Sequence, residues 1–392
     1  MSTGKMLLHN QRIALALSGG GVRAAAFHAG VLRWMAEEQW LERVTALSTV
    51  SGGSLFAGLV FAQAGNRWPS SEDYRIRGYA EVRGILTQSS LSIDALLRLA
   101  NPLNWRFFLS RANVFAISIR KKWGITAQLK DLPPTPVWSI NGTTAENGRR
   151  FRFKGDTVGD YEIGYAKAGK MLLAEALAVS AAFPGGIGPL TLDTSKYQWM
   201  KKEVWDDEAD PQIIHPPFSK LHLYDGGLYD NLGMEPFFDV GKGNIKKNCG
   251  ADFIVIADAG APYKRSRIPG PLHPKRLLRT LDIVMGQARA LRVRPFIRFL
   301  QSSPESGRYY QIGSSVHEQI KNGLVPKENL GQDPNEFLSD AEIARAKGYP
   351  TTLLALGEAD FDLIARHGYE TAKWNNHVKD TFRGSEFMSL KM

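Results

Sequence analysis

Short apolar runs alternate with segments of helical periodicity along the first part of the chain. Ile13–Ser18 (IALALS) predicts a buried strand, and Ala24–Gln39 repeats apolar residues at helical spacing. Thr45–Val50 predicts a second strand, and the run of small and apolar residues that begins at Ser51 predicts another helix. This alternation is typical of parallel βαβ units, so the sequence predicts an α/β fold.

Residues 66–130 have a different pattern. Two Trp-bearing helical stretches, LLRLANPLNWRFFLSRA and VFAISIRKKWG, interleave Arg and Lys with Leu, Phe and Trp. Such a mixture fits an interfacial membrane-binding surface or a lid over an apolar pocket. It also fits a helical insertion that packs on the core, and we favour that interpretation.

Strand and helix patterns resume after this segment. In chain order we expect strands at Val137–Asn141 and Arg150–Phe153 joined through Asn147-Gly148, a helix at Ala174–Ala182 that ends before Pro184-Gly185-Gly186, strands at Leu221–Tyr224 and Phe253–Asp258, and helices from Pro271 onward with a break at Pro304–Gly307. No long linker is evident. The organisation we predict is one α/β domain over residues 10–265, with a helical insertion at about 66–130, and a helical C-terminal region over 266–392 packed on the same domain.

Composition narrows the class of protein. The 392 residues are 43% hydrophobic and 22% charged, which excludes a largely disordered chain. No apolar run is long enough for a transmembrane helix, and the N-terminus lacks the apolar core of a secretory signal. The single cysteine, Cys249, excludes an internal disulfide and a Cys-rich metal site. We therefore expect a soluble protein of a reducing compartment such as the cytoplasm.

The net charge of +10 is unevenly distributed. Between Lys264 and Arg298 the only acid is Asp282, against ten basic residues: Lys264, Arg265, Arg267, Lys275, Arg276, Arg279, Arg289, Arg292, Arg294 and Arg298. An anionic lipid surface, a nucleic acid or a small phosphorylated ligand could each use this segment, and a solvated face without a partner is the alternative. No helix-turn-helix or zinc pattern accompanies it, so we expect no nucleic-acid partner.

A triple-glycine loop follows the first predicted strand. In Ser18-Gly19-Gly20-Gly21-Val22-Arg23, consecutive backbone N–H groups and the start of a helix suit a bound anion. The loop also matches a dinucleotide-binding pattern through Gly19, Gly21 and Ala24. That interpretation requires an acidic residue at the end of the next strand, where Ser51 stands instead.

Two further motifs carry candidate chemistry. Ser51 lies on a predicted strand-to-helix turn, as in the nucleophile elbow G-x-S-x-G, with Gly53 matching and Thr49 in place of the first glycine. A helix N-cap serine is the alternative. Asp225 ends a predicted strand and precedes two glycines, which places a carboxylate where α/β active sites gather. A plain Asp-Gly turn is the alternative there.

Together, in this order, the motifs resemble the patatin-like phospholipase family. Ala181-Ala182-Phe183-Pro184 and Asn231-Leu232-Gly233 add matches in the family's order. The resemblance spans residues 12–262, and Gly348–Tyr369 is similar to the helical tail of bacterial members. The sequence V-S-G-G-S around Ser51 is closest to the bacterial branch. The fold that this implies is a three-layer sandwich with a mostly parallel central sheet.

The resemblance also implies a lipid acyl hydrolase with a Ser–Asp dyad, in which Ser51 is the nucleophile and Asp225 the base. The oxyanion would be held by N–H groups of the glycine loop, from Gly19, Gly20, Gly21 and Val22. Arg23 matches the family's basic position, where it would order the loop or bind the phosphate of the substrate. No histidine, metal or other cofactor is implied. Ser54 is the rival nucleophile and Asp258 the rival base.

The partner expected from this resemblance is a phospholipid membrane surface, contacted through residues 96–123 and 264–298. The alternative function is a signal-gated, membrane-degrading phospholipase effector activated by a small anionic ligand such as a cyclic nucleotide. No ligand motif is visible for that activator. The sequence leaves open the oligomeric state, the acyl-chain preference and the headgroup preference.

Overall fold

A computed structural model of the chain describes residues 11–107, 110–184, 186–202, 210–260, 267–270, 273, 275–330 and 332–377. Gly185, Lys264, Arg265 and Pro271, which the sequence analysis singled out, lie outside the described residues.

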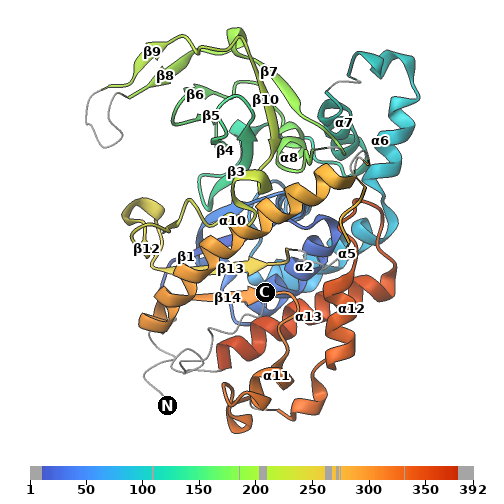
Figure 1. Ribbon diagram of the computed structural model, residues 1–392, viewed down its shortest axis with the longest axis vertical. Helices are drawn as coiled ribbons and strands as arrows, with labels where there is room; N and C mark the ends of the chain where they lie inside the picture. Colours follow the sequence, from blue (N-terminus) through green and yellow to red (C-terminus); the bar gives the residue numbers. More distant parts are fainter. Residues whose placement is uncertain are drawn as a thin grey trace.

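Five parallel strands form the part of the sheet that carries the sequence motifs (Figure 1). Their spatial order is β14 (Gly307–Gln311), β13 (Phe253–Asp258), β1 (Ile13–Leu17), β2 (Val44–Thr49) and β3 (Val137–Thr144). Leu17 at the end of β1 is in register with Thr49 and with Ala257. The loops after β1, β2 and β13 therefore meet at one edge of the sheet, the carboxyl edge.

Side chains of the parallel strands alternate between two apolar cores. Ile13, Leu15 and Leu17 pack into the core shared with the helices α2 (Gly21–Glu37), α3 (Gly52–Gln63) and α13 (Glu358–His377). Ala14 and Ala16 face the core shared with α10 (Lys275–Ser302), which crosses the sheet obliquely in Figure 1. A strand buried on both faces explains the unbroken apolar run IALAL. The arrangement confirms the predicted α/β sandwich.

Antiparallel strands continue the sheet beyond β3. The additional strands are β4 (Arg150–Lys154), β5 (Thr157–Asp160), β6 (Gly164–Lys167), β8 (Trp199–Lys201) and β9 (Gln212–Ile214) on one path, with β10 (Lys220–Asp225) pairing to both β3 and β7 (Leu190–Asp193). The predicted hairpin is confirmed, because β3 and β4 pair antiparallel. The helix α8 (Leu173–Ser180) ends near the carboxyl edge, and the short α9 (Gly227–Asp230) follows β10. A separate small hairpin consists of β11 (Phe238–Asp239) and β12 (Asn244–Ile245).

The segment 66–130 is helical, as predicted. It comprises α4 (Ser71–Asp73), one π-helical turn (Tyr74–Gly78), α5 (Tyr79–Gln88), α6 (Leu91–Leu99), a 3-10 turn (Pro102–Phe107) and α7 (Ala112–Lys122). α5 and α7 bury apolar side chains in the main core, as expected for an insertion. In α6 only Leu91 is buried.

The C-terminal region is helical with one strand that the sequence analysis did not anticipate. β14 pairs with β13 and extends the parallel sheet directly after α10. The helices α11 (Val316–Lys321), α12 (Asp340–Gly348) and α13 follow. Gly30 of α2 and Gly368 of α13 allow a close helix crossing, since a Cβ on Gly30 would lie 1.7 Å from a carbonyl oxygen of α13.

Candidate active site

Ser51 occupies a strained turn between β2 and α3. Its backbone angles, φ 51° and ψ −120°, are ones that residues other than glycine rarely adopt. The turn is tight: a Cβ on Gly52 would lie 2.2 Å from the Gly21 carbonyl oxygen, and one on Gly53 would lie 2.4 Å from that of Leu17. The Ser51 side chain makes no N-cap hydrogen bond to α3. The turn resembles a nucleophile elbow, and Ser51 stands at the N-cap position of α3 without capping it through its side chain.

A buried network of hydrogen bonds joins the turn at Ser51 to β3 and α8. The Thr49 hydroxyl accepts hydrogen bonds from the Trp138 indole at 2.9 Å and from the Ser54 hydroxyl at 2.7 Å. Ser54 also contacts the Ser180 hydroxyl at 2.8 Å, and that hydroxyl accepts the Ser51 N–H at 3.0 Å. Thr49 thus has a structural role where the elbow motif has glycine. Ser54, fully buried and bonded twice, is not an accessible nucleophile.

Sequence reasoning missed Ser180 and Trp138 in this network. Ser180 is 129 positions from Ser51, at the end of α8, and no local pattern links the two. The one sequence feature that indicates this contact is the segment of small residues at the end of α8, because small side chains let the end of that helix approach Ser51.

The triple-glycine loop lies directly against Ser51. A Cβ on Gly19 would be 3.0 Å from the Ser51 Cβ, and Gly20 and Gly21 have φ of 147° and 62°. The Gly19 N–H donates to the Asn231 carbonyl at 3.0 Å and the Val22 N–H to the Thr352 carbonyl at 2.9 Å. Within the described part of the chain, the N–H groups of Gly20 and Gly21 donate no hydrogen bond.

Asp225 ends β10 and faces the elbow. It is 3% exposed, and its Oδ1 accepts the Gly227 N–H at 2.7 Å. Burial raises the pKa of Asp225 to about 7, although the Gly227 N–H and the nearby Ser51 hydroxyl both act to lower it. A carboxylate with a pKa near neutrality is a competent general base for a serine hydroxyl.

Arg23 orders the glycine loop from inside the protein. The side chain is 2% exposed, and its guanidinium donates to the Tyr349 carbonyl at 2.7 Å and to the Ala259 carbonyl at 3.1 Å. Burial lowers the pKa of Arg23 to about 10, and the neighbouring Asp258 partly offsets this. Of the two roles expected for Arg23, this placement supports loop ordering. The assignment of Arg23 to substrate binding stays a prediction that this burial does not favour.

Asp258 forms a buried ion pair. Arg289 of α10 donates to its Oδ2 through Nε at 2.7 Å and through a second guanidinium nitrogen, and the Tyr309 hydroxyl and the Gly260 N–H also donate to the carboxylate. Burial alone would raise the pKa of Asp258, but Arg289 and these hydrogen bonds hold it below its usual range. Asp258 is therefore a poor proton acceptor, in contrast to Asp225.

The same helix pairs with Asp230. Arg292 lies 3.6 Å from the Asp230 carboxylate, which also accepts the Leu232 and Glu235 N–H groups within its own turn. Two of the basic residues in segment 264–298, Arg289 and Arg292, thus neutralise buried aspartates. These two arginines are therefore engaged inside the protein, and use of the segment by an anionic partner stays a prediction for its other basic residues.

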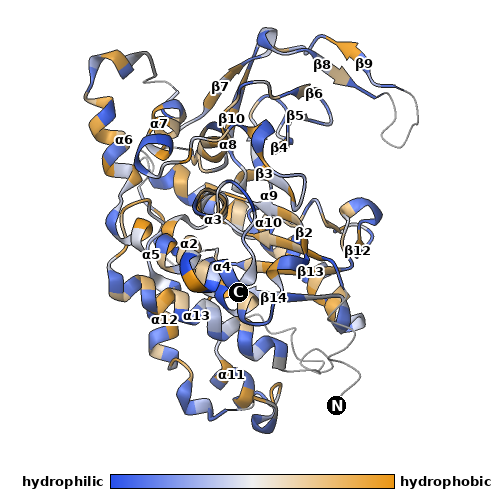
Figure 2. Ribbon diagram, turned by 180° about the vertical axis from the view of Figure 1, so that it is seen from behind, coloured by the Kyte–Doolittle hydropathy of each residue, from blue (hydrophilic) through white to orange (hydrophobic). Residues whose placement is uncertain are grey.

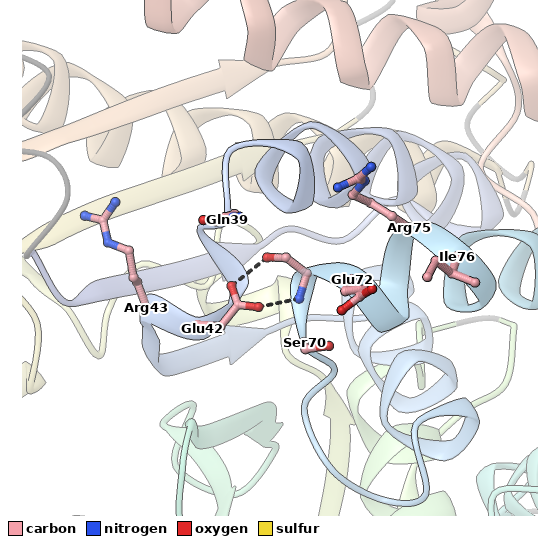
Figure 3. Close-up of a pocket in the computed structure, with 8 residues that line it drawn as sticks. Gln39, Glu42, Arg43, Ser70, Glu72, Arg75 and Ile76 are labelled. Carbon is pink, nitrogen blue, oxygen red and sulfur yellow. Dashed lines mark hydrogen bonds between the residues drawn. The ribbon is translucent and has the colours of Figure 1, made fainter.

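A surface cavity of about 740 Å³ lies elsewhere, beside the start of α4 (Figure 3). Its lining includes Glu42, Arg43 and Arg75, and the Glu42 carboxylate accepts hydrogen bonds from the Ser71 N–H and hydroxyl, both at 2.6 Å. Although partial burial opposes it, these bonds lower the pKa of Glu42. This serine–carboxylate pair therefore lacks the raised pKa found at Asp225.

Among the described residues, no three His, Cys, Asp or Glu side chains are grouped to bind a metal ion. No described helix is both long and apolar enough to cross a bilayer. His28 lies behind the glycine loop with Nε2 3.0 Å from the Ser18 carbonyl oxygen, and complete burial lowers its pKa to about 4.

Comparisons with known proteins agree with this geometry. Residues 15–238 match the family described as Patatin-like phospholipase. A structure of human GIVD cytosolic phospholipase A2 is similar with a TM-score of 0.55 and 14% identity, over 95% of this chain and 60% of that one. The same human protein with a methyl gamma-linolenyl fluorophosphonate inhibitor gives a TM-score of 0.50 and 14% identity, over 95% of this chain and 59% of that chain. No curated protein matches significantly. The family match covers more than half of the sequence, and the chain belongs to the patatin-like phospholipase family.

Proposed function

We propose that the protein is a lipid acyl hydrolase that cleaves phospholipid esters with Ser51 as nucleophile and Asp225 as base. One observation carries the proposal: a strained serine whose hydroxyl lies close enough to a buried carboxyl to influence its pKa, which burial raises to about 7. The family membership and the human phospholipase of similar fold support the substrate class. The V-S-G-G-S form of the elbow leads us to place the chain in the bacterial branch.

In the acylation step, ionised Asp225 accepts the Ser51 proton while the Ser51 oxygen attacks the ester carbonyl carbon. The tetrahedral intermediate collapses by breaking the bond to the leaving alcohol, which takes the proton from Asp225. The products of this step are the acyl-enzyme and the alcohol, a lysophospholipid when the substrate is a diacyl phospholipid. Proton transfer directly between Ser51 and Asp225 makes a histidine unnecessary in this scheme.

In the deacylation step, a water molecule attacks the acyl carbonyl and Asp225 accepts its proton. Collapse of the second tetrahedral intermediate breaks the bond to Ser51, whose oxygen recovers the proton from Asp225. The fatty acid leaves and the starting state returns. One carboxylate therefore serves as base and acid in both halves.

The developing oxyanion would be held by the glycine loop. Gly20 and Gly21 are the donors we propose, because the N–H groups of Gly19 and Val22 already bond to carbonyl oxygens of Asn231 and Thr352. The start of α2 adds the positive end of a helix dipole at the same place. Removing one such donor costs about 3 kcal/mol of transition-state stabilisation in comparable enzymes.

Hydrolysis of phospholipid vesicles tests the proposal. Wild-type protein should release free fatty acid and lysophospholipid, detected by mass spectrometry, and Ser51→Ala and Asp225→Asn should each reduce release by about 1,000-fold or more. The double variant should be little worse than either single one, since the two groups act as one unit. Substantial hydrolysis by Ser51→Ala would refute the nucleophile assignment.

A further inference from the structure

We propose that an apolar rim beside the catalytic residues docks on a bilayer that contains anionic lipids. The rim consists of the exposed apolar residues of α6, of the 3-10 turn after it and of α10 from Leu277 to Leu291. The proposal rests on the proposed lipid hydrolysis and names the surface that brings Ser51 to its substrate. Its two halves lie on elements that flank the catalytic residues on different sides.

Between Leu277 and Leu291, α10 exposes apolar residues, while two arginines of the same helix point inward. Leu277, Val284 and Leu291 recur every seven residues on one face and are 77%, 58% and 61% exposed. On the neighbouring face, Arg289 and Arg292 reach the buried Asp258 and Asp230. A helix that packs only on its own protein shows the reverse pattern, with leucines inside and arginines outside.

The position of α10 places this apolar face beside the site. Met285 lies against the Asp225-Gly226-Gly227 turn, where a Cβ on Gly227 would meet its Cε at 3.3 Å. Arg292 contacts Asp230 and Tyr229 of α9, and the buried side chains of α10 from Val293 onward pack in the core that includes Tyr309 of β14. Leu277 and Leu278 therefore lie on the part of α10 that precedes its contact with the catalytic turn.

α6 carries the second half of the rim. Leu96 and Leu97 are 69% and 68% exposed, and Leu103 and Trp105 in the following 3-10 turn are 79% and 63% exposed. In Figure 2 the orange of apolar residues is visible on α6 at the periphery of the molecule. Such leucines with an exposed tryptophan match the composition of interfacial membrane anchors.

A short chain of contacts links α6 to the oxyanion loop. The Ser92 N–H in the first turn of α6 donates to the Leu353 carbonyl at 3.3 Å. The adjacent Thr352 carbonyl accepts the Val22 N–H, and Leu354 is 45% exposed. The exposed apolar side chains of α6 thus connect to the glycine-loop side of Ser51, while those of α10 connect to its Asp225 side.

Charge favours a lipid bilayer over a second copy of this chain. Lys275, Arg276 and Arg279 lie in the first turns of α10 beside the apolar face, and Asp282 is the one acid before Arg289. Two copies packed through α10 would bring these cations together and repel. Anionic headgroups would instead attract them, at about 1 kcal/mol for each basic residue at the surface, or about fivefold in affinity.

Vesicle binding by rim variants tests the docking surface. Leu277→Asp/Val284→Asp and Leu96→Asp/Leu97→Asp remove apolar area from each half of the rim. Each double variant should weaken co-sedimentation with phosphatidylcholine–phosphatidylglycerol vesicles about tenfold or more. Binding is measured with Ser51→Ala added, so that the vesicles stay intact. Ile213→Asp, on a 63% exposed residue of β9, is the matched control and should bind as the parent does.

Two readouts keep the docking surface separate from the catalytic assignment. With Ser51 present, the rim variants should hydrolyse a short-chain soluble ester at the wild-type rate and lose hydrolysis of vesicle lipid. No soluble-ester hydrolysis in the wild type would refute the proposed function without bearing on the rim. Unchanged vesicle binding by both rim variants would refute the docking surface. It would also be refuted if the wild type sediments as a dimer and the rim variants sediment as monomers that still bind vesicles.

Discussion

Replacing Asp225 by asparagine should stabilise the folded protein while it removes the catalytic base. Burial holds the pKa of this carboxyl at about 7 against an ordinary value of 3.8. The folded state therefore keeps the proton through a pH range in which the unfolded chain releases it, so the wild-type protein loses stability as pH rises from about 4 to about 7. The side-chain amide in Asp225→Asn would keep the hydrogen bond from the Gly227 N–H and carry no charge.

The magnitude follows from the shift. At about 1.4 kcal/mol for each pKa unit, the raised pKa of Asp225 costs the folded state about 4 kcal/mol at pH 8, where the carboxyl is ionised, and about 1.5 kcal/mol at pH 5, where it holds a proton that the unfolded chain would release. The advantage of Asp225→Asn in free energy of unfolding should thus grow by about 2.5 kcal/mol between these two pH values.

Urea-induced unfolding of wild type and Asp225→Asn at pH 5 and pH 8 measures this difference. Ser51→Ala is the matched control, since it leaves the carboxyl buried and should keep the pH dependence of the wild type. An advantage of Asp225→Asn that stays constant or shrinks toward pH 8 would show that the carboxyl does not titrate near neutrality, and the assignment of Asp225 as a base tuned by burial would be wrong. The kcat/KM for a soluble ester should, by the same reasoning, rise with an apparent pKa near 7.

Three further substitutions probe the surroundings of the dyad. Arg289→Ala should lower the free energy of unfolding by about 3–5 kcal/mol, because it leaves the Asp258 carboxylate buried without its cation. Arg298→Ala, on the exposed side of the same helix, should change it by about 0.5 kcal/mol or less, and thermal unfolding measures both. Gly21→Ala should reduce kcat about 100-fold at nearly unchanged KM, since φ there is 62° and a Cβ would lie 2.4 Å from the Thr352 carbonyl oxygen; Gly84→Ala, with open space around it, should be neutral. Thr49→Val should cost about 1–3 kcal/mol of stability, because the Trp138 and Ser54 donors lose their acceptor.

The parts of the fold that depend on local pattern could be predicted from the sequence. The apolar run at Ile13–Leu17 predicts a strand, and the glycines that follow Ser51 predict a turn and the start of a helix within a few residues. β14 was not predicted, because GRYYQ has no apolar run and becomes a strand by pairing with β13 some fifty residues earlier. The short strands β5–β9 were not predicted either, because each spans only three or four residues and forms by pairing with its neighbours in the sheet.

The candidate site, too, could be predicted only where local motifs mark its residues. Ser51 and Asp225 are recognisable from motifs, but the contact between them depends on the folded arrangement of β2 and β10. The roles of Arg23 and Arg289 could not be predicted, since a run of basic residues does not tell which of them face a buried carboxylate or carbonyl. In the structure Arg23 and Arg289 point inward, whereas leucines of the same helix as Arg289, such as Leu277 and Leu291, are exposed.

Mapping the site of fluorophosphonate labelling tests the central claim most directly. The probe should modify wild-type protein at Ser51, as identified by peptide mass spectrometry, and labelling should be abolished in Ser51→Ala and retained in Ser54→Ala. Labelling should slow strongly in Asp225→Asn, because the serine then lacks its base. A label found on any other serine, or one that persists in Ser51→Ala, would contradict the account.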